Sequence, residues 1–270
     1  MKRAAARRIF RLFPRYWNDL TLPLGDLGEA LATLFFPPVC YYCKAPLDSR
    51  AGKKLCPSCS DKIVLTEAPY CLRCSKTDVF LDEETLLCPD CRDRSRERDP
   101  LSRVLAGSRY EALVPRLIAK FKYGRCRYLA DPLADIIMKH PEFDVLAPHI
   151  AAFVPVPMHW ARKLARGFDQ AEDLAREMSR RTGVPVVKAL KRTRYHKPQA
   201  SLNMAERTRN LGGAFVCGKK KRAFLKKQGR DKLIALVDDV CTTGTTAELC
   251  ARALKRAGAR NIVLFCVAKT

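Results

Sequence analysis

Apolar and polar positions alternate with a helical period over most of the second half of the chain. Residues 110–140 carry the pattern of consecutive helices, and residues 168–183 that of one helix that ends at Gly183. The inward face of that helix is made of Ala171, Leu174, Ala175 and Met178. A further helix is expected over residues 246–258, with an apolar face of Ala247, Cys250, Ala251, Leu254 and Ala257.

Short unbroken apolar runs separate these helices and predict strands. The runs are residues 151–157, 184–187, 233–237 and 261–268, and another strand is expected to begin within 213–216. A fully apolar run suits a strand that is buried on both faces of a sheet. Strands that alternate with helices therefore predict an α/β fold, with a parallel sheet flanked by helices.

Eight of the 13 cysteines form four C-x-x-C pairs in residues 40–91. Each such turn places two thiolates on one side of a knuckle, and two knuckles complete a tetrahedral zinc site. We expect one structural zinc ion on Cys40, Cys43, Cys56 and Cys59, and a second on Cys71, Cys74, Cys88 and Cys91. The spacing leaves open an interleaved arrangement of the first pair with the third. Disulfides are the alternative, but they suit secreted chains, and we find no export signal.

The remaining five cysteines are expected to fill the core, with Cys241 as an exception in a loop; they are residues 126, 217, 241, 250 and 266. Ahead of the cysteine pairs, residues 27–35 predict a short helix that Pro37 and Pro38 stop. The charged segment 91–102 is typical of a linker. We expect a basic leader with a short helix over 1–39, a double zinc ribbon over 40–100, and the main domain over 101–270.

Charge is strongly unbalanced, with 51 lysines and arginines against 28 acids and a net charge of +23. Residues 1–16 hold six cations and no acid, and residues 188–230 hold 14 cations and one acid. Such clusters favour a polyanionic partner over a merely solvated basic surface. No run approaches the roughly 18 apolar residues of a membrane span. We therefore expect a cytoplasmic protein, with contact of the N-terminal region with a membrane surface as a weaker alternative.

The stretch "VDDVCTTGTT" places two carboxylates before a loop rich in hydroxyl groups. A ligand loop after a parallel strand lies at the crevice above the sheet, and the next helix, expected to start near Thr245, offers free N–H groups to a phosphate. Adjacent carboxylates suit the vicinal hydroxyls of a sugar, directly or through Mg²⁺. These features together indicate a phosphoribosyl group. The alternative is a plain strand–turn–helix with capping threonines.

The same stretch resembles the 5-phosphoribosyl 1-diphosphate (PRPP) signature of type I phosphoribosyltransferases. Two further stretches, "FVPVPMHWARKLARGFDQAEDLA" and "KPQASLNMAERTRNLGGAF", resemble the ComF family, as does the paired-cysteine ribbon ahead of them. The resemblance covers nearly everything from Gly25 to the end. It implies a type I phosphoribosyltransferase-like parallel sheet flanked by helices, preceded by a small double zinc-ribbon domain.

The resemblance also implies site residues. Asp238 and Asp239 would be the catalytic acids that hold the ribose hydroxyls, within a PRPP site of Val237, Asp238, Asp239, Val240, Cys241, Thr242, Thr243, Gly244, Thr245 and Thr246. The diphosphate loop would involve Met158, His159, Arg162, Lys163 and Arg166, although the three cations alone are also typical of a solvated helix edge. Asp169 replaces an asparagine of the family pattern and adds a negative charge there. The family's hood segment corresponds to residues 193–210, with Lys197, Gln199, Arg207 and Asn210, where a solvated basic loop is the alternative.

Two functions follow as hypotheses. The resemblance implies a PRPP-binding protein that acts in DNA uptake, competence or single-stranded DNA processing, with competence or DNA-processing proteins as partners. The alternative is an active phosphoribosyltransferase that uses Mg²⁺ and PRPP to modify a nitrogenous acceptor, although no acceptor pocket is recognisable. Tyr195, Phe215 and Phe224 lie among cations and are candidates for stacking on bases. Residues 218–230 are interpreted first as a flexible solvated loop and second as a DNA contact.

Overall fold

The computed structural model describes residues 37–48, 54–94, 99–193 and 214–270. The chain divides into two compact units, Met1–Cys56 and Pro57–Thr270. The second unit contains every strand of the main sheet. The helix predicted over 27–35 and the basic leader before it lie outside the described residues, so they stay predictions, as do the three domain boundaries.

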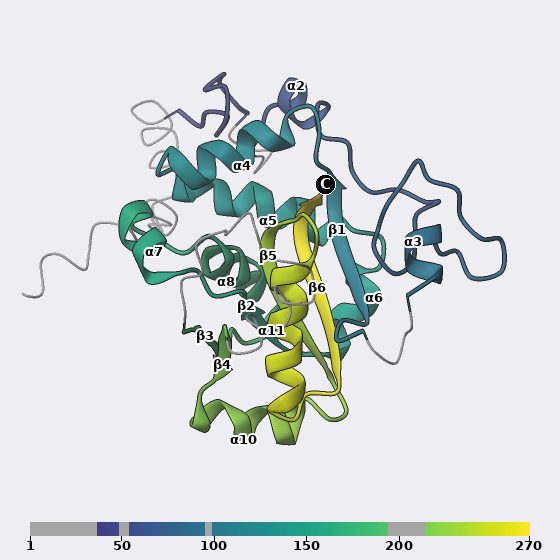
Figure 1. Ribbon diagram of the computed structural model, residues 1–270. Helices are drawn as coiled ribbons and strands as arrows, with labels where there is room; N and C mark the ends of the chain where they lie inside the picture. Colours follow the sequence, from purple (N-terminus) through teal and green to yellow (C-terminus); the bar gives the residue numbers. More distant parts are fainter. Residues whose placement is uncertain (1–36, 49–53, 95–98, 194–213) are drawn as a thin grey trace, which may run out of the picture. The chain divides into compact units, whose positions relative to one another are not determined.

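Four parallel strands form the main sheet, in the order β1 (Arg103–Arg109), β6 (Asn261–Lys269), β5 (Leu233–Cys241) and β2 (Ile150–Pro155). The two central strands, β5 and β6, are the longest and are nearly continuous in apolar residues, as strands buried on both faces must be. The predicted fold class is confirmed: a parallel sheet flanked by helices follows the paired-cysteine segment (Figure 1).

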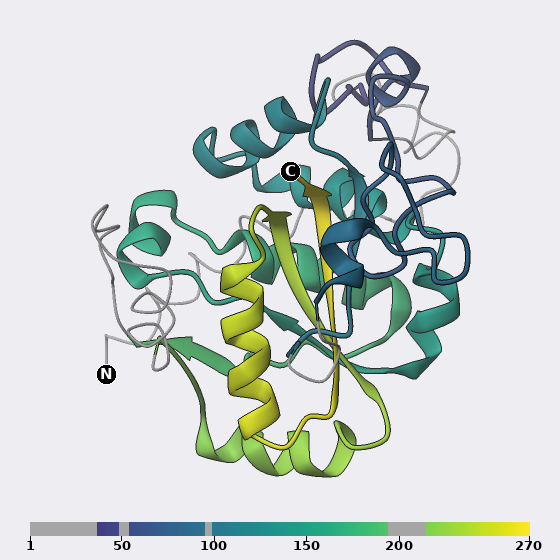
Figure 2. The same ribbon diagram turned by 45° about the vertical axis from the view of Figure 1, so that its right-hand side comes forward.

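Helices cover both faces of this sheet. On one face lie α5 (Ala130–Met138) and α8 (Gln170–Thr182), which pack against each other and against the strands. The other face is covered by α11 (Thr245–Arg256), whose Ala247, Cys250, Ala251 and Leu254 are buried, as the periodicity predicts. Helix α11 lies in front of β5 and β6 in Figure 1 and beside them in Figure 2. Gly183 ends α8 in the left-handed conformation predicted for its C-cap, with φ of 73°.

Shorter elements complete the second unit. They are α2 (Pro57–Ser60), α3 (Pro89–Arg92), α4 (Val114–Tyr123), η3 (Arg127–Leu129), α6 (Phe143–Leu146), η4 (Ala147–His149) and α7 (Trp160–Arg166). The strand predicted over 184–187 reduces to one parallel bridge between Val186 and Phe153. Among the described residues, no helix has the length and apolar content that a bilayer crossing requires.

A two-stranded antiparallel sheet of β3 (Leu190–Arg192) and β4 (Phe215–Cys217) leads into α10 (Lys219–Gln228). The interpretation of residues 218–230 as a flexible loop is wrong, because most of them form this helix. Leu225 is fully buried in the core beside α11, and Phe224 packs against the same cluster. Two adjacent apolar side chains are enough to dock a helix whose remaining surface is basic.

The outer edge of β1 is covered by the segment that carries the cysteine pairs. Val104 N donates to Arg73 O at 2.8 Å, and Arg109 N donates to Val64 O at 2.9 Å. Between them, Ala106 N donates to the Ser75 hydroxyl at 3.3 Å. A sheet edge whose N–H groups are satisfied by the same chain no longer offers a template for pairing with another chain. On the inner side, a Cβ at Gly107 would lie 2.0 Å from Ile136 O, so only glycine permits this approach of α5.

Candidate functional site

The two adjacent acids lie inside β5 rather than in the loop after it, which corrects the predicted end of the strand at Val237. Pairing with β6 continues through Val240 and Cys241, so the strand runs past both acids. Successive side chains of a strand alternate between the two faces of the sheet, yet the two carboxylates stay close enough to repel each other. Asp239 is buried, with 8% of its surface exposed, whereas Asp238 is more accessible. The Asp238 carboxylate accepts a hydrogen bond from Asp239 N at 2.8 Å.

Lys122, near the end of α4, neutralises one of these acids. Its ammonium nitrogen lies 2.8 Å from Asp239 Oδ1. Burial, followed by the repulsion of the neighbouring Asp239 carboxylate, raises the pKa of Asp238 to about 8. The pair therefore holds one carboxylate fixed by a cation and one carboxyl that titrates near neutrality. Sequence reasoning missed Lys122, because nothing in the local pattern of an amphipathic helix announces a contact with a distant strand.

The threonine-rich loop joins β5 to α11 as predicted, and α11 begins at Thr245. Gly244 adopts a left-handed conformation with φ of 80°, and no side chain caps the first turn of α11 through it. The hydroxyls of Thr243 and Thr245 lie 2.9 Å apart. Thr242, Thr243, Thr245 and Thr246 are all exposed. The loop thus presents four hydroxyl groups around a helix N-terminus, which is the arrangement that binds a phosphate.

This loop lines a cavity of about 200 Å³ together with the second cysteine segment. Thr242, Thr243 and Gly244 line it together with the cations Arg73, Lys76, Arg94 and Lys269. Three of these four cations already face acids: Arg73 pairs with Asp99 at 2.6 Å, Lys76 with Asp90 at 2.8 Å and Arg94 with Glu248 at 3.3 Å. The participation of the second ribbon in this cavity was not predicted from the sequence.

The residues predicted for a diphosphate loop separate into three environments. His159 is buried and caps α7, its Nδ1 accepting from Ala161 N at 3.2 Å, while Met158 beside it is half-buried. Arg162 and Arg166 line a second cavity, described below. Lys163 turns away from that cavity and lies 3.4 Å from Glu172. The structure therefore does not bring all five residues to one point.

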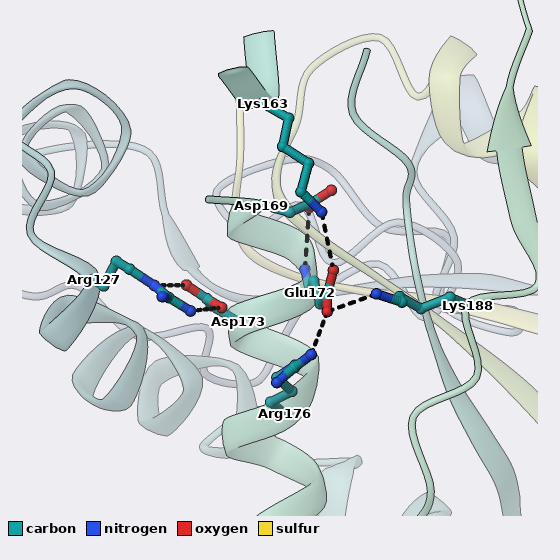
Figure 3. A network of polar contacts seen from close by, with 7 residues as sticks. All are labelled: Arg127, Lys163, Asp169, Glu172, Asp173, Arg176 and Lys188. Atoms are coloured by element: carbon teal, nitrogen blue, oxygen red, sulfur yellow. Dashed lines mark hydrogen bonds and ion pairs between the residues drawn. The ribbon is translucent and has the colours of Figure 1, made fainter. Parts of the chain in front are cut away.

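Glu172 is the centre of an ionic network at the start of α8 (Figure 3). One of its oxygens accepts from Arg176 at 2.5 Å and Lys188 at 3.0 Å, and the other faces Lys163. Burial alone raises the pKa of Glu172, but hydrogen bonds from Lys188 and Arg176 outweigh it and lower the pKa to about 2. The next residue, Asp173, forms a bidentate pair with Arg127, with both contacts at 2.7 Å.

Asp169 has a structural task in this region. Its carboxylate caps α8 by accepting from Glu172 N at 3.3 Å. Asparagine and aspartate serve equally well as N-caps, so the departure from the family pattern leaves the backbone of this turn unchanged. Burial raises the pKa of Asp169 above that of an ordinary aspartate.

The eight paired cysteines form the two groups that were predicted, and the interleaved alternative is wrong. The sulfur atoms of Cys40, Cys43, Cys56 and Cys59 lie within 4.8 Å of one another, as do those of Cys71, Cys74, Cys88 and Cys91. Cys43 Sγ lies 3.6 Å from Cys56 Sγ, and Cys74 Sγ lies 3.8 Å from Cys88 Sγ. A tetrahedral Zn²⁺ with bonds of about 2.3 Å separates its ligands by about 3.8 Å. The donor sets therefore fit zinc, and all thirteen cysteines are free of disulfides.

The structure also tests the predictions for the five unpaired cysteines and for the aromatic residues proposed to stack on bases. Cys217, Cys250 and Cys266 are buried, and so is Cys241, which was expected to be an exception, whereas Cys126 is only half-buried. Phe215 is 4% exposed, and Phe224 packs on the core, so neither ring is available to stack on a base. Tyr195 and the hood residues Lys197, Gln199, Arg207 and Asn210 lie outside the described residues. The described ends of that segment, Thr193 and Ala214, are joined by a hydrogen bond of 2.9 Å.

Comparison with known proteins agrees with the cysteine-rich segment and with the whole chain. Residues 31–92 match the family described as "Double zinc ribbon domain". The chain is 27% identical over 248 residues to Competence protein F of Haemophilus influenzae, a match that covers 87% of this chain and 98% of that protein. It is 29% identical over 241 residues to DNA utilization protein YhgH of Escherichia coli strain K12, covering 88% and 99% respectively. The resemblance to the ComF family inferred from the motifs is confirmed.

Solved structures also include a similar protein, described as the allosteric regulatory enzyme of purine biosynthesis. The match has a TM-score of 0.34 and 16% sequence identity, and it covers 53% of this chain and 26% of that one.

Proposed function

We propose that this ComF-type protein binds a phosphoribosyl compound, with PRPP as the first candidate, at the carboxyl edge of its sheet and acts in DNA uptake or single-stranded DNA processing. One observation supports the proposal most directly: the central strand β5 carries two acids and is followed by a four-threonine loop that leads into the N-terminus of α11, where the N-cap is Gly244. The carboxylates are acceptors for sugar hydroxyls, and the threonine hydroxyls and helix N–H groups that follow directly are donors for a terminal phosphate.

Each part of the ligand has a matching group in this site. The ribose hydroxyls donate to Asp238 and Asp239, while the 5′-phosphate accepts from the N–H groups and hydroxyls of residues 242–246. The diphosphate lies toward the turn after β2, where Met158 and His159 precede the cations of α7. Val237, Val240 and Cys241 contribute backbone and packing, since Val237 and Cys241 are buried.

Mg²⁺ belongs to the proposal as a companion of the ligand's diphosphate. The acids themselves do not form a ready magnesium site, because Asp239 is paired with Lys122 and Asp238 accepts from a backbone N–H. The donor set suits ribose hydroxyls better than a bare divalent cation, which prefers several free oxygens. When bound, the ion would neutralise charge on the diphosphate; the chain's own groups hold and orient the sugar.

The partners follow from charge and from the relatives. Two relatives carry names that refer to competence and to DNA utilisation, and a net charge of +23 favours a polyanion. Single-stranded DNA is therefore the proposed macromolecular ligand, with the hood residues 197, 199, 207 and 210 as contacts. Competence or DNA-processing proteins are proposed as further partners. The eight paired cysteines would bind zinc as thiolates, and thiols stay reduced in the cytoplasm. We therefore propose that the protein acts in the cytoplasm.

A second candidate function is transfer of the phosphoribosyl group to a nitrogenous acceptor. The raised pKa of Asp238, about 8, favours it, because a carboxyl that titrates near neutrality can exchange a proton with a reacting group. The test is incubation with PRPP, Mg²⁺ and a panel of nucleobases, with and without single-stranded DNA. Release of diphosphate that depends on one base establishes transfer, and its absence with every base leaves the binding function alone.

Binding itself is tested by the thermal shift that PRPP produces. We expect a PRPP-dependent rise in Tm in the natural protein and none in a variant with Asp238→Asn and Asp239→Asn. Asp231→Asn, an exposed acid just before β5, is the matched control. An equal shift in the double variant would remove the two acids from the site and with them the proposed mode of binding.

A further inference from the structure

A cationic cavity lies between the end of α4 and α7, and its lining contains no carboxylate. The residues that line it are Lys122, Tyr123, Arg125, Arg162, Ala165 and Arg166. Four of the six are cations, and one is aromatic. We call this the α4–α7 pocket. It differs from the cavity at the threonine loop, where most of the cations already face acids.

The arginines of the α4–α7 pocket are available to a ligand. Within the described part of the chain, Arg125, Arg162 and Arg166 form no ion pair, and Arg125 and Arg162 are exposed. Arg166 donates to the side-chain oxygen of Gln170 at 2.9 Å and places its guanidinium 4.9 Å from the centre of the Tyr123 ring. Three arginine forks around one pocket match the geometry of phosphate oxygens.

Tyr123 supplies a second, independent feature. Tyr123 is 74% exposed, although it is a large aromatic residue at the end of a helix in which Val114, Leu117, Ile118 and Phe121 are buried. The contact with Arg166 fixes the orientation of the ring without burying it. An exposed ring that a guanidinium orients beside phosphate-binding cations is the combination by which proteins hold single-stranded nucleic acid.

The backbone of Arg125 adds a third observation. Its φ is 52°, in the left-handed region that favours glycine, and such a conformation costs a β-carbon residue about 1 kcal/mol. No hydrogen bond or ion pair of the Arg125 side chain among the described residues offsets that cost. A strained residue with an exposed functional group is characteristic of a binding site.

We propose that the α4–α7 pocket binds the backbone phosphates of single-stranded DNA, with Tyr123 stacked on a base. The inference rests on the proposed function for its choice of polyanion. It adds Lys122, Tyr123 and Arg125, which neither the motifs nor the hood segment include, to Arg162 and Arg166 of the predicted diphosphate loop. A membrane fits the pocket poorly. The exposed apolar side chains of α7, Trp160 at 70% and Leu164 at 78%, are one turn apart and do not line it.

The test measures the affinity for a fluorescent oligothymidylate of about 20 nucleotides by anisotropy at several salt concentrations. We expect Tyr123→Ala to weaken binding about ten-fold, within the range for one lost stacking contact. Arg125→Gly should lower the slope of log affinity against log salt by about 0.7, as for one lost phosphate contact. Glycine suits the φ of residue 125, so the Tm of that variant should not fall and misfolding cannot imitate the result.

Matched controls remove the same residue types elsewhere. Arg116→Gln changes an exposed arginine of the same helix, and Tyr110→Ala changes another exposed tyrosine; neither residue lines the pocket. We expect both controls to bind the oligonucleotide within about two-fold of the natural protein. Unchanged affinity and salt slope in both Tyr123→Ala and Arg125→Gly would overturn the proposal.

Two further measurements separate the neighbouring explanations. If Tyr123→Ala and Arg125→Gly abolish the PRPP thermal shift together with DNA binding, the pocket is the diphosphate subsite and the proposal fails; a retained shift supports it. If the variants lose binding only to phosphatidylglycerol vesicles, a membrane is the partner and the proposal again fails. Failure of the phosphoribosyl proposal shows instead as a PRPP shift unaffected by Asp238→Asn and Asp239→Asn, with the DNA results unchanged.

Discussion

The ammonium group of Lys122 lies 2.8 Å from the carboxylate of Asp239, so a helix that precedes the site by more than a hundred residues supplies the ionic partner of its buried acid. The same lysine lines the α4–α7 pocket. One side chain therefore belongs both to the α4–α7 pocket and to the acid pair. A phosphate in the pocket would compete with Asp239 for this cation.

Replacing Lys122 with methionine should destabilise the protein by about 1–3 kcal/mol, because Asp239 is then a buried carboxylate without a partner. The free energy of unfolding from urea titrations measures the loss. Combining Lys122→Met with Asp239→Asn should restore much of it, since no unpaired charge remains. Strictly additive losses in that cycle would show that the two side chains do not interact in solution.

The acid pair should make stability depend on pH. The pKa of Asp238 is about 8 in the folded protein against 3.8 for an ordinary aspartate, so the folded state binds the extra proton between these values. By linkage its contribution to stability is present at low pH and is lost as the pH rises from about 4 to 8. We expect Asp238→Asn to stabilise the protein by about 2 kcal/mol at pH 8 and much less at pH 4.5, reading one pKa unit as about 1.4 kcal/mol and allowing for partial exposure. Urea titrations at the two pH values measure this difference, and equal gains at both would contradict the prediction.

Glu172→Gln should cost about 1–2 kcal/mol, because Lys163, Arg176 and Lys188 lose the acid that holds them together. The folded pKa of about 2 lies below the ordinary 4.5, so this contribution is present above pH 4.5 and is lost as the pH falls toward 2. Glu177→Gln, on the same helix and paired only with exposed Arg180, is the control and should cost under about 0.5 kcal/mol. Similar costs for the two variants at pH 7 would remove the special role of the network.

Zinc should be bound with a stoichiometry of two per chain, measured by elemental analysis of the purified protein. Chelation, or Cys71→Ser with Cys88→Ser, should unfold the ribbon around Arg73, since four thiolates supply on the order of 10 kcal/mol to such a segment. Cys126→Ser removes a thiol outside both groups and should leave the metal content at two. A protein that keeps its near-ultraviolet circular dichroism after complete removal of metal would refute a structural role for zinc.

Much of the main fold follows from short-range pattern. The strand beginning at Leu233 and the helix over 245–256 were predictable because apolar periodicity is written locally. The end of β5 was not, because its last residues are polar and stay in the strand only through pairing with β6, as between Cys241 and Lys269. Likewise α10 was not predicted, because its sequence is a basic run. Its position depends on the packing of Leu225 against a core that distant elements form.

The candidate site also contains features that the sequence predicts and features that only the folded structure shows. The cysteine groups and the threonine loop are contiguous motifs, and sequence spacing was enough to find them. The partner of Asp239 and the lining of the α4–α7 pocket arise only when α4, α7 and β5 meet. The cap formed by Asp169 is a local contact with Glu172 N, which was not predicted. Phe215 was assigned to stacking because it lies among cations, whereas β4 turns it into the core.

The hydrogen bonds from β1 to Arg73 O, Ser75 and Val64 make the cover of the sheet edge depend on the fold of the cysteine segment. Without zinc we expect the cysteine segment to unfold and the outer edge of β1 to be exposed. The amides of Val104 and Ala106 would then lose their hydrogen-bond partners. Newly made chains that have not yet bound zinc would then pair through the exposed edges of β1. We therefore expect bound zinc to limit self-association, and turbidity during refolding should rise as zinc is withheld.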